Sequence, residues 1–345
     1  MHLTPLEAKA SFDLIVALLC EEGSRIGTFQ SLVDQKRKSG EVFSSNCVDL
    51  IQHHLLGSRL FRFISQHESE SVFSANAQER ALKAYLNSSR MHTLAELEIS
   101  RLASFFGQEK IEAVFIKGWV YAKRYYAYPE DRPFFDIDIL FRIEDRPRVE
   151  ALLPELSLQR ALHPGRFFAN QDKIDLFHAR NPSIRVECHF ALGYRKYALK
   201  GHWGRLEDYR FKGTSLFHLS LLDEYLYLIY HAVVQHRFQK LGWLLDLAQM
   251  RRQSDLSFQN ILNEARKYNL TRAVQWAESF LFHFCGVGTG EGAQPDLETW
   301  FHDIATGEIE NSLLKRARLR AMMQGGWGPL IKYALMKEWA IRTQS

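Results

Sequence analysis

The feature that most constrains how this chain folds is an acidic pair that opens an apolar run, Asp136-Ile137-Asp138-Ile139-Leu140-Phe141. In a β-strand, successive side chains alternate between the two faces of the sheet, so Asp136 and Asp138 project to one face and Ile137 to the other. Neighbouring carboxylates repel each other unless a cation neutralises them. Mg²⁺ prefers carboxylate and phosphate oxygens. The pattern therefore predicts a metal site on a buried strand. An Asp-x-Asp pair on a solvent-exposed edge without a metal has the same sequence pattern and is the alternative.

Composition narrows the class of protein. The 345 residues are 46% hydrophobic and 24% charged, which is typical of a globular protein with a substantial core. The net charge of +4 suits an anionic ligand such as a nucleotide and is too small for a dedicated nucleic-acid binder. The four cysteines are scattered, which indicates reduced thiols and a cytoplasmic protein without a zinc knuckle or disulfide framework. Neither a signal peptide nor a membrane-spanning segment is expected, and so no membrane partner.

The hydrophobic periodicity predicts an α/β (α+β) fold with three regions. Residues 1–106 are expected to be helical, residues 107–200 to form a small mixed sheet with helices, and residues 201–345 to be helical again from about Leu216. Outside the middle region, one helix is expected to start at Thr4-Pro5-Leu6-Glu7. Further helices are expected over Val48–Gln66, Ala75–Gly107, Leu241–Met250 and Ile261–Phe284.

The middle region alternates short apolar runs with helical patterns. The strands expected there are Ile111–Ile116, Asp136–Phe141 and Ile184–Leu192, with a hairpin from Phe167–Ala169 and Ile174–His178. The helices expected between them are Trp119–Tyr126 and Asp145–Leu156.

Further candidate site residues come from these elements. In the strand Ile184–Leu192, Glu187 and His189 share one side and can face the aspartates. Lys117-Gly118 ends the first strand and begins a helix, whose free amides and lysine can bind phosphate oxygens. Arg132 lies in the loop before Asp136 and can reach a triphosphate. Such parts are those of a metal-dependent site for phosphoryl or nucleotidyl transfer.

The order of these motifs resembles the uncharacterised nucleotidyltransferase family of the DNA polymerase β-like nucleotidyltransferase superfamily. The matching segments are Phe115-Ile116-Lys117-Gly118, Tyr128-Pro129, Arg132, Asp136-Ile137-Asp138-Ile139-Leu140, Val186-Glu187-Cys188-His189-Phe190, His231-Ala232 and Leu241–Leu247. The resemblance implies a nucleotidyltransferase-like palm in which Asp136, Asp138 and Glu187 hold metal, with two Mg²⁺ ions and a nucleoside triphosphate as substrate.

The implied reaction moves a nucleoside monophosphate from the triphosphate to an unidentified hydroxyl acceptor on a small molecule, peptide or protein. Lys117, Gly118 and Arg132 would bind the nucleotide. His189 would either contact the nucleotide or orient a carboxylate, or it would be a half-buried histidine of the sheet. Two departures bear on activity: Lys117-Gly118 stands where the superfamily has Gly-Ser, and bulky Phe135 precedes Asp136. A catalytically inactive nucleotide-sensing or partner-binding module on the same fold is the alternative.

Other polar residues have simpler interpretations. His231 and His236 lie on an apolar helix, where packing is the expected role. Asp246 lies among leucines and is expected to be structural, with an arginine or a helix end as its partner. The basic segment Lys315–Arg342 is expected to be a solvated helix face, with RNA as a weakly indicated alternative partner.

Overall fold

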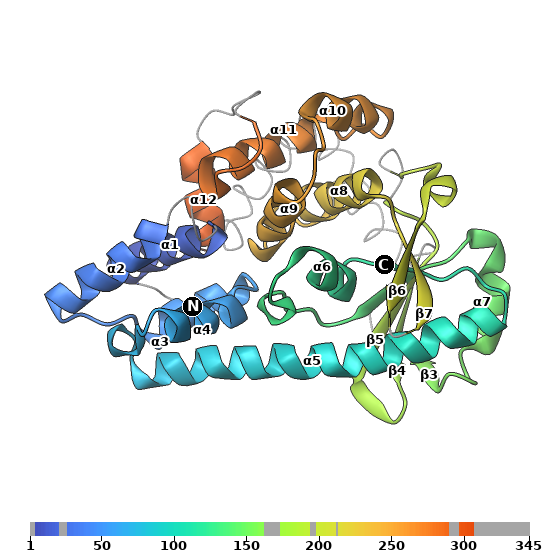
Figure 1. Cartoon of the computed structure of the whole chain (residues 1–345), viewed down its shortest axis with the longest axis horizontal. Helices are drawn as coiled ribbons and strands as arrows, with labels where there is room; N and C mark the ends of the chain where they lie inside the picture. Colours follow the sequence, from blue (N-terminus) through green and yellow to red (C-terminus); the bar gives the residue numbers. More distant parts are fainter. Residues whose placement is uncertain are drawn as a thin grey trace, which may run out of the picture.

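The protein has a mixed α/β architecture in which a seven-stranded sheet is flanked by helices, as the sequence predicts (Figure 1). The computed structural model describes residues 4–20, 26–161, 173–193, 198–211, 213–289 and 297–306. None of the helices in these ranges is long and apolar enough to cross a bilayer.

Five α-helices precede the sheet in the part of the chain that the structure describes. Their bounds are Pro5–Leu19 (α1), Ile26–Ser39 (α2), Ser45–His53 (α3), Gly57–Gln66 (α4) and Ala75–Gln108 (α5). The predicted start of α1 is confirmed, because Thr4 and Glu7 form a reciprocal capping box. The single helix predicted over Val48–Gln66 is wrong. The chain breaks between α3 and α4, where Leu55 has φ 66° and a Cβ on Gly57 would lie 2.7 Å from the Gln52 side chain.

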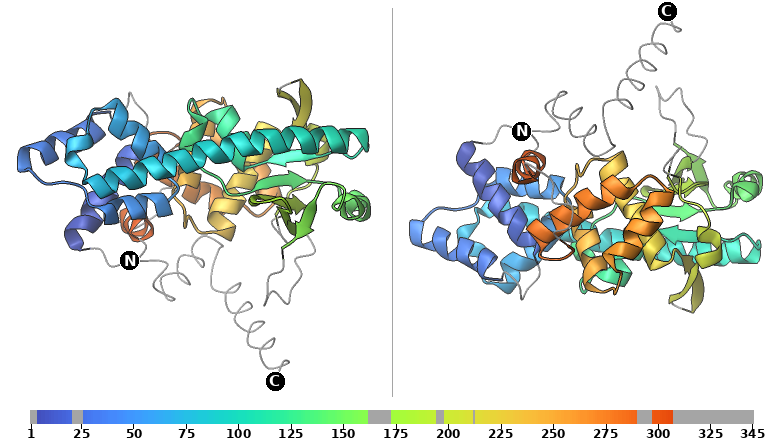
Figure 2. Two further views of the ribbon diagram at one scale, coloured as in Figure 1. Left: turned by 90° about the horizontal axis from the view of Figure 1, so that it is seen from below. Right: turned by 90° about the horizontal axis from the view of Figure 1, so that it is seen from above.

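Helix α5 connects the N-terminal helices to the sheet. Its 34 residues span about 50 Å at the rise of an α-helix. Figures 1 and 2 show that it runs along one side of the molecule, first beneath α3 and α4 and then beside the sheet. Near its end, the Phe106 ring packs on Phe141 at the end of a central strand, with ring centroids 4.8 Å apart. The sheet is therefore supported by the helix that leads into it.

The sheet is mixed, with the order β3-β4-β5-β2-β1-β7-β6. Its strands are Val114–Ile116 (β1), Ile137–Leu140 (β2), Leu158–Arg160 (β3), Lys173–His178 (β4), Asn181–His189 (β5), Glu207–Phe211 (β6) and Thr214–His218 (β7). Strand β2 is antiparallel to β1 and parallel to β5. Ile137 and Ile139 are buried, as their alternation with the aspartates predicts.

Two expectations about the sheet need correction. The chain is not yet helical at Leu216, because β7 continues to His218 and the next helix starts after the Ser220 cap. The sheet therefore runs past residue 200, and the division into three regions stays a prediction. Strand β2 also starts one residue later than expected, so Asp136 lies just before it.

The remaining helices lie between strands or follow the sheet in the chain. Those between strands are Gly118–Tyr125 (α6) and Arg146–Leu152 (α7). After the sheet come Leu221–Ile229 (α8), the π-helix Tyr230–Gln235 (η6), Gly242–Arg252 (α9), Phe258–Lys267 (α10), Thr271–Phe280 (α11), the π-helix Leu281–Cys285 (η7) and Leu297–Ala305 (α12). The continuous helix predicted over Ile261–Phe284 is wrong, because Asn269 turns the chain with φ 58°. The predicted segments Phe167–Ala169 and Lys315–Arg342 lie outside the described residues.

Candidate active site

A cavity of about 420 Å³ lies between the sheet and the helices α8 and α9 with the π-helix η6. All seven residues predicted for the site line it: Lys117, Gly118, Arg132, Asp136, Asp138, Glu187 and His189. Its volume is within the usual range for small-molecule sites. The residues that the sequence selects from four separate segments therefore share one space.

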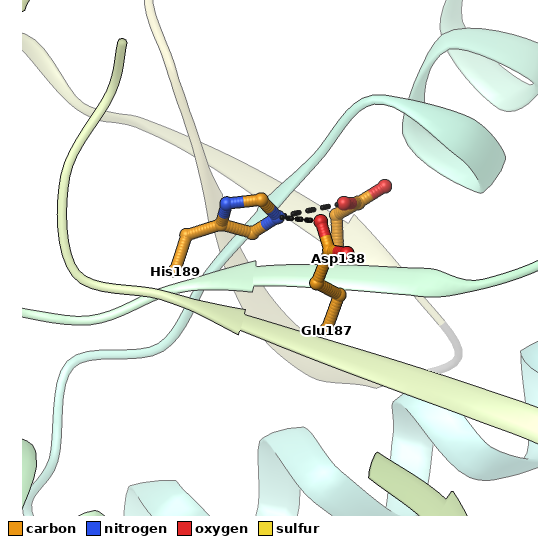
Figure 3. A group of neighbouring side chains, drawn as sticks. All are labelled: Asp138, Glu187 and His189. Atoms are coloured by element: carbon orange, nitrogen blue, oxygen red, sulfur yellow. Dashed lines mark hydrogen bonds and ion pairs between the residues drawn. The ribbon is translucent and has the colours of Figure 1, made fainter. Parts of the chain in front are cut away.

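The acidic cluster is built by the pairing of two parallel strands. Asp138 of β2 is in register with Glu187 of β5, so their side chains leave the sheet next to each other. His189, two residues further along β5, lies over both carboxylates (Figure 3). Its Nε2 is 2.8 Å from Asp138 Oδ1 and 2.8 Å from Glu187 Oε2. The imidazole therefore holds the two carboxylates in place, and its own pKa is raised because these hydrogen bonds outweigh its burial.

Lys117 supplies a cation to the same cluster. Its Nζ is 2.6 Å from Asp138 Oδ1, and its side chain is almost fully buried. Burial opposes the charge on the ammonium, but the Asp138 carboxylate outweighs it and raises the pKa of Lys117. The residue has φ 53° and ψ −147°, a backbone conformation that costs a non-glycine residue about 1–3 kcal/mol. Such strain persists where the surrounding structure imposes it, as it does at functional sites.

Gly118 allows the chain to turn closely into α6 at this point. It has φ 28°, and a Cβ there would lie 3.4 Å from the Asp136 carbonyl oxygen and 3.6 Å from Phe134. The N-terminus of α6 thus begins beside the acidic pair, as predicted.

Asp136 differs from the other two acids. It lines the cavity but does not belong to the group of ligand atoms that Asp138, Glu187 and His189 form. Burial, and then the neighbouring Asp138 carboxylate, raise the pKa of Asp136 to about 6. Its role as a metal ligand stays a prediction.

Strand β4 adds two charged residues that the sequence analysis missed. Lys173 contacts the Glu187 carboxylate, and its Nζ is 3.3 Å from Asp175 Oδ1. Asp175 is in register with Glu187 across the two strands. The alternation of Lys173 and Asp175 with Ile174 was visible in the sequence, but only the strand pairing brings these residues to Glu187.

Glu187 is therefore surrounded by donors. Burial alone would raise the pKa of its carboxyl, but the hydrogen bond and charge of His189, with Lys117, hold that pKa well below its usual range. A carboxyl that stays ionised at all ordinary pH values suits the binding of a cation better than the uptake of a proton.

Arg132 reaches the cavity wall with its guanidinium already bound. Its Nη2 is 2.9 Å from Asp246 Oδ2, and the Tyr126 hydroxyl donates to Asp246 Oδ1 at 2.6 Å. The structural role and arginine partner predicted for Asp246 are thus confirmed. Arg132 as a phosphate ligand stays a prediction.

A group of three aromatic rings lines part of the cavity wall formed by the helices. The rings are those of His231, His236 and Trp243, which contact one another with ring centroids 4.6–4.9 Å apart. The packing predicted for the two histidines is present, but their position in the cavity wall was not expected. Phe135 also lines the cavity and is 62% exposed, whereas the neighbouring Phe134 is buried.

The donor set fits a divalent metal ion. Ligand atoms of Asp138, Glu187 and His189 lie within 4.8 Å of one another. Two carboxylates provide the oxygen ligands that Mg²⁺ prefers, and an imidazole nitrogen is also accepted by transition metals such as Mn²⁺.

A comparison with protein families supplies the class of this chain. The model of a family described as uncharacterised nucleotidyltransferase matches residues 44–286, more than half of the 345 residues. The chain belongs to this family. The resemblance predicted from the motifs is thereby confirmed, and the acidic cluster, Lys117 and the three rings all fall within the matched part of this nucleotidyltransferase family member.

Comparisons with individual proteins add less. The chain is similar to the lincosamide antibiotic adenylyltransferase LnuA, solved with lincomycin bound, with 15% identity and a TM-score of 0.32 over 46% of this chain and 96% of LnuA. No curated protein matches the chain.

Proposed function

We propose that this nucleotidyltransferase family member transfers a nucleoside monophosphate from a Mg²⁺-bound nucleoside triphosphate to a hydroxyl acceptor. The observation that carries the proposal is the meeting of Asp138, Glu187 and His189 with Lys117 in one cavity. Family membership supports the reaction type. The acceptor and the number of metal ions go beyond it.

The carboxylates would hold the metal. Asp138 and Glu187, oriented by His189, would be ligands of one Mg²⁺, and Asp136 would extend the set toward a second ion. The metal would offset the negative charge that develops on the phosphate oxygens, an effect of several kcal/mol in such reactions.

The nucleotide would be bound by groups on the other side of Asp138. The Lys117 ammonium and the first amides of α6, beginning at Gly118, would bind phosphate oxygens. Arg132, held by Asp246, would add a positive charge at the cavity wall. Since these donors come from rigid elements, the α-phosphorus would be fixed relative to the carboxylates before reaction.

The reaction has a simple balance. The acceptor oxygen forms a bond to the α-phosphorus, and the bond from that phosphorus to the bridging oxygen of the β-phosphate breaks. Pyrophosphate leaves, and the hydroxyl proton passes to a carboxylate of the site.

The test uses the full chain with NTPs labelled at the α-phosphate, Mg²⁺ and a panel of hydroxyl acceptors. Wild type is compared with Asp138→Asn and with Asp208→Asn, a control on β6 where Asp208 accepts a hydrogen bond from Ser215. We expect label transfer with wild type and the control but not with Asp138→Asn. Binding of Mg²⁺ and NTP without transfer to any acceptor favours the non-catalytic nucleotide-sensing module, and absence of both binding and transfer removes the proposal.

A further inference from the structure

We propose that His231, His236 and Trp243 form the nucleobase subsite of this cavity; we call these three side chains the ring wall. This inference rests on the proposed function and deepens it. It assigns a place to the base of the nucleoside triphosphate, which the acidic cluster and Lys117 do not bind.

The ring wall is a compact aromatic surface. The Trp243 ring lies 4.8 Å from His231 and 4.9 Å from His236, with the two histidine rings 4.6 Å apart. All three line the same cavity as Asp138 and Lys117. The cavity therefore has a charged part formed by the sheet and an aromatic part formed by η6, α9 and the turn between them.

Both histidines of the ring wall are neutral. Burial lowers the pKa of His236 to about 4, and burial together with the charge of Lys117 lowers that of His231 well below its usual value. Within the described residues, the group suited to a metal ion includes neither of them. Neutral imidazoles offer a flat face together with one donor and one acceptor each, which matches an uncharged heterocycle.

The backbone that carries the ring wall is strained. His231 lies in the π-helix η6, and such helices occur often at functional sites. Arg237 and Phe238 follow with φ 52° and 53°, although neither is a glycine. Each such conformation costs about 1–3 kcal/mol and clusters where ligands are bound.

The turn is held against a second strained segment. Gly242 donates to the His54 carbonyl at 2.8 Å, and a Cβ on Gly242 would lie 2.9 Å from Leu55, itself at φ 66°. Leu55 also lines the cavity. Strain at three non-glycine residues around one aromatic surface points to a binding role for that surface, beyond core packing.

The chemistry of the two parts of the cavity matches the two ends of a nucleoside triphosphate. The phosphates suit Lys117 and metal-bound carboxylates, and the base suits a neutral aromatic wall. Stacking of a base on an aromatic side chain contributes about 1–3 kcal/mol, which corresponds to about a 5- to 150-fold change in affinity.

The test separates the base from the phosphates. Binding of a non-hydrolysable NTP analogue and of inorganic tripolyphosphate, both with Mg²⁺, is measured by calorimetry for wild type, Trp243→Ala and Trp243→Phe. The control is Trp203→Ala, because Trp203 is also half-buried but packs on Arg142 outside the cavity. We expect Trp243→Ala to weaken analogue binding about 5- to 150-fold while tripolyphosphate binding stays unchanged. Trp203→Ala should bind both ligands as wild type does, and Trp243→Phe, which keeps an aromatic ring, should restore analogue binding relative to Trp243→Ala.

Three other outcomes overturn the inference. Equal loss of both ligands in a Trp243→Ala protein that keeps the circular dichroism spectrum of the wild type shows that Trp243 does not bind the base separately from the phosphates. Unchanged analogue binding with lower transfer means that the ring wall serves the acceptor. Analogue affinity that is unchanged in both Trp243→Ala and His236→Ala excludes stacking altogether. In these three cases the proposed function can still stand, whereas a wild type that binds neither ligand contradicts both proposals.

A fluorescence measurement covers the case in which Trp243→Ala does not fold. The analogue should quench tryptophan emission in wild type and in Trp203→Phe but not in Trp243→Phe. Equal quenching in the two phenylalanine variants contradicts the subsite.

Discussion

Two groups of buried or half-buried acids in this protein are neutralised in different ways. The helical side holds Asp131, Glu224 and Asp246, which we call the closed acids, and each is bound by arginine. Their ion pairs are Asp131 with Arg59 and Arg62, Glu224 with Arg124, and Asp246 with Arg132. The cavity acids are Asp136, Asp138 and Glu187, and the basic side chains that contact the latter two are lysines and one histidine.

The difference in cations has a physical meaning. The planar guanidinium of arginine has a fixed set of donors and forms directed, often bidentate, bonds to a carboxylate. The ammonium of lysine is a point charge on a flexible stem. Lys117 and Lys173 can therefore exchange partners when another cation or a phosphate arrives, whereas the closed acids keep theirs. We infer that the closed acids serve stability and the cavity acids serve ligand binding, and the predictions below separate the two.

The largest expected effect is on stability, at a closed acid. Asp246→Ala leaves Arg132 buried without its carboxylate, and breaking such a pair costs about 3–5 kcal/mol of the free energy of unfolding. The matched change in the cavity, Asp138→Ala, should cost less than half as much, because the Glu187 and Asp136 carboxylates remain near the Lys117 ammonium. Denaturant unfolding of both variants measures the difference, and equal losses contradict the distinction.

The second effect is on activity, and here the substitution of a cavity acid should cost more than the substitution of a closed acid. Glu187→Gln keeps the shape of the side chain but removes the negative charge that we propose binds the metal, so we expect transfer to fall about 1,000-fold, or about 4 kcal/mol in the activation free energy. Glu224→Gln makes the same change at a closed acid, and the protein that remains folded should transfer at close to the wild-type rate. Initial rates at saturating Mg²⁺ and NTP test this pair.

The cavity acids were predictable because the strands that carry them have a strong alternation. Ile137 and Ile139 on β2, and Val186 and Cys188 on β5, are buried, so the polar residues between them had to face the other side. Asp246 was predictable on similar grounds, since a carboxylate among leucines needs a cation.

Other parts could not be read from the sequence. Strand β6 has no fully buried residue, so no alternating pattern marks it, and it was included in a helical region. Asp175 and Lys173 join the site only through the register of β4 with β5. The ring wall requires η6 and α9 to meet at a turn with positive φ, which tertiary packing imposes against local preference.

A smaller effect concerns competition between Lys117 and a metal ion. Lys117→Met removes the ammonium that lies 2.6 Å from Asp138 Oδ1. We expect the variant without nucleotide to bind Mn²⁺ about tenfold more tightly, a gain of about 1.4 kcal/mol. The reason is that the metal ion is no longer repelled by the Lys117 ammonium and no longer has to displace it from Asp138. Affinity for NTP should fall, since a phosphate ligand is lost. Calorimetry with Mn²⁺ alone and with NTP measures both, and Lys123→Met, which removes the partner of Glu96, is the control. Weaker Mn²⁺ binding in Lys117→Met contradicts exchange at this site.

The smallest effect is a dependence of metal binding on pH. The pKa of Asp136 is about 6, and the charged groups that face it are Asp138, Lys117, Glu187 and Arg185. Above pH 6 the carboxylate is free to bind a cation, and near pH 6 a proton competes, so Mn²⁺ affinity should fall about twofold between pH 8 and pH 6. Asp136→Asn should bind Mn²⁺ more weakly at pH 8 and lose this step near pH 6. A step near pH 6 that stays unchanged in Asp136→Asn removes Asp136 from the cavity acids that bind metal.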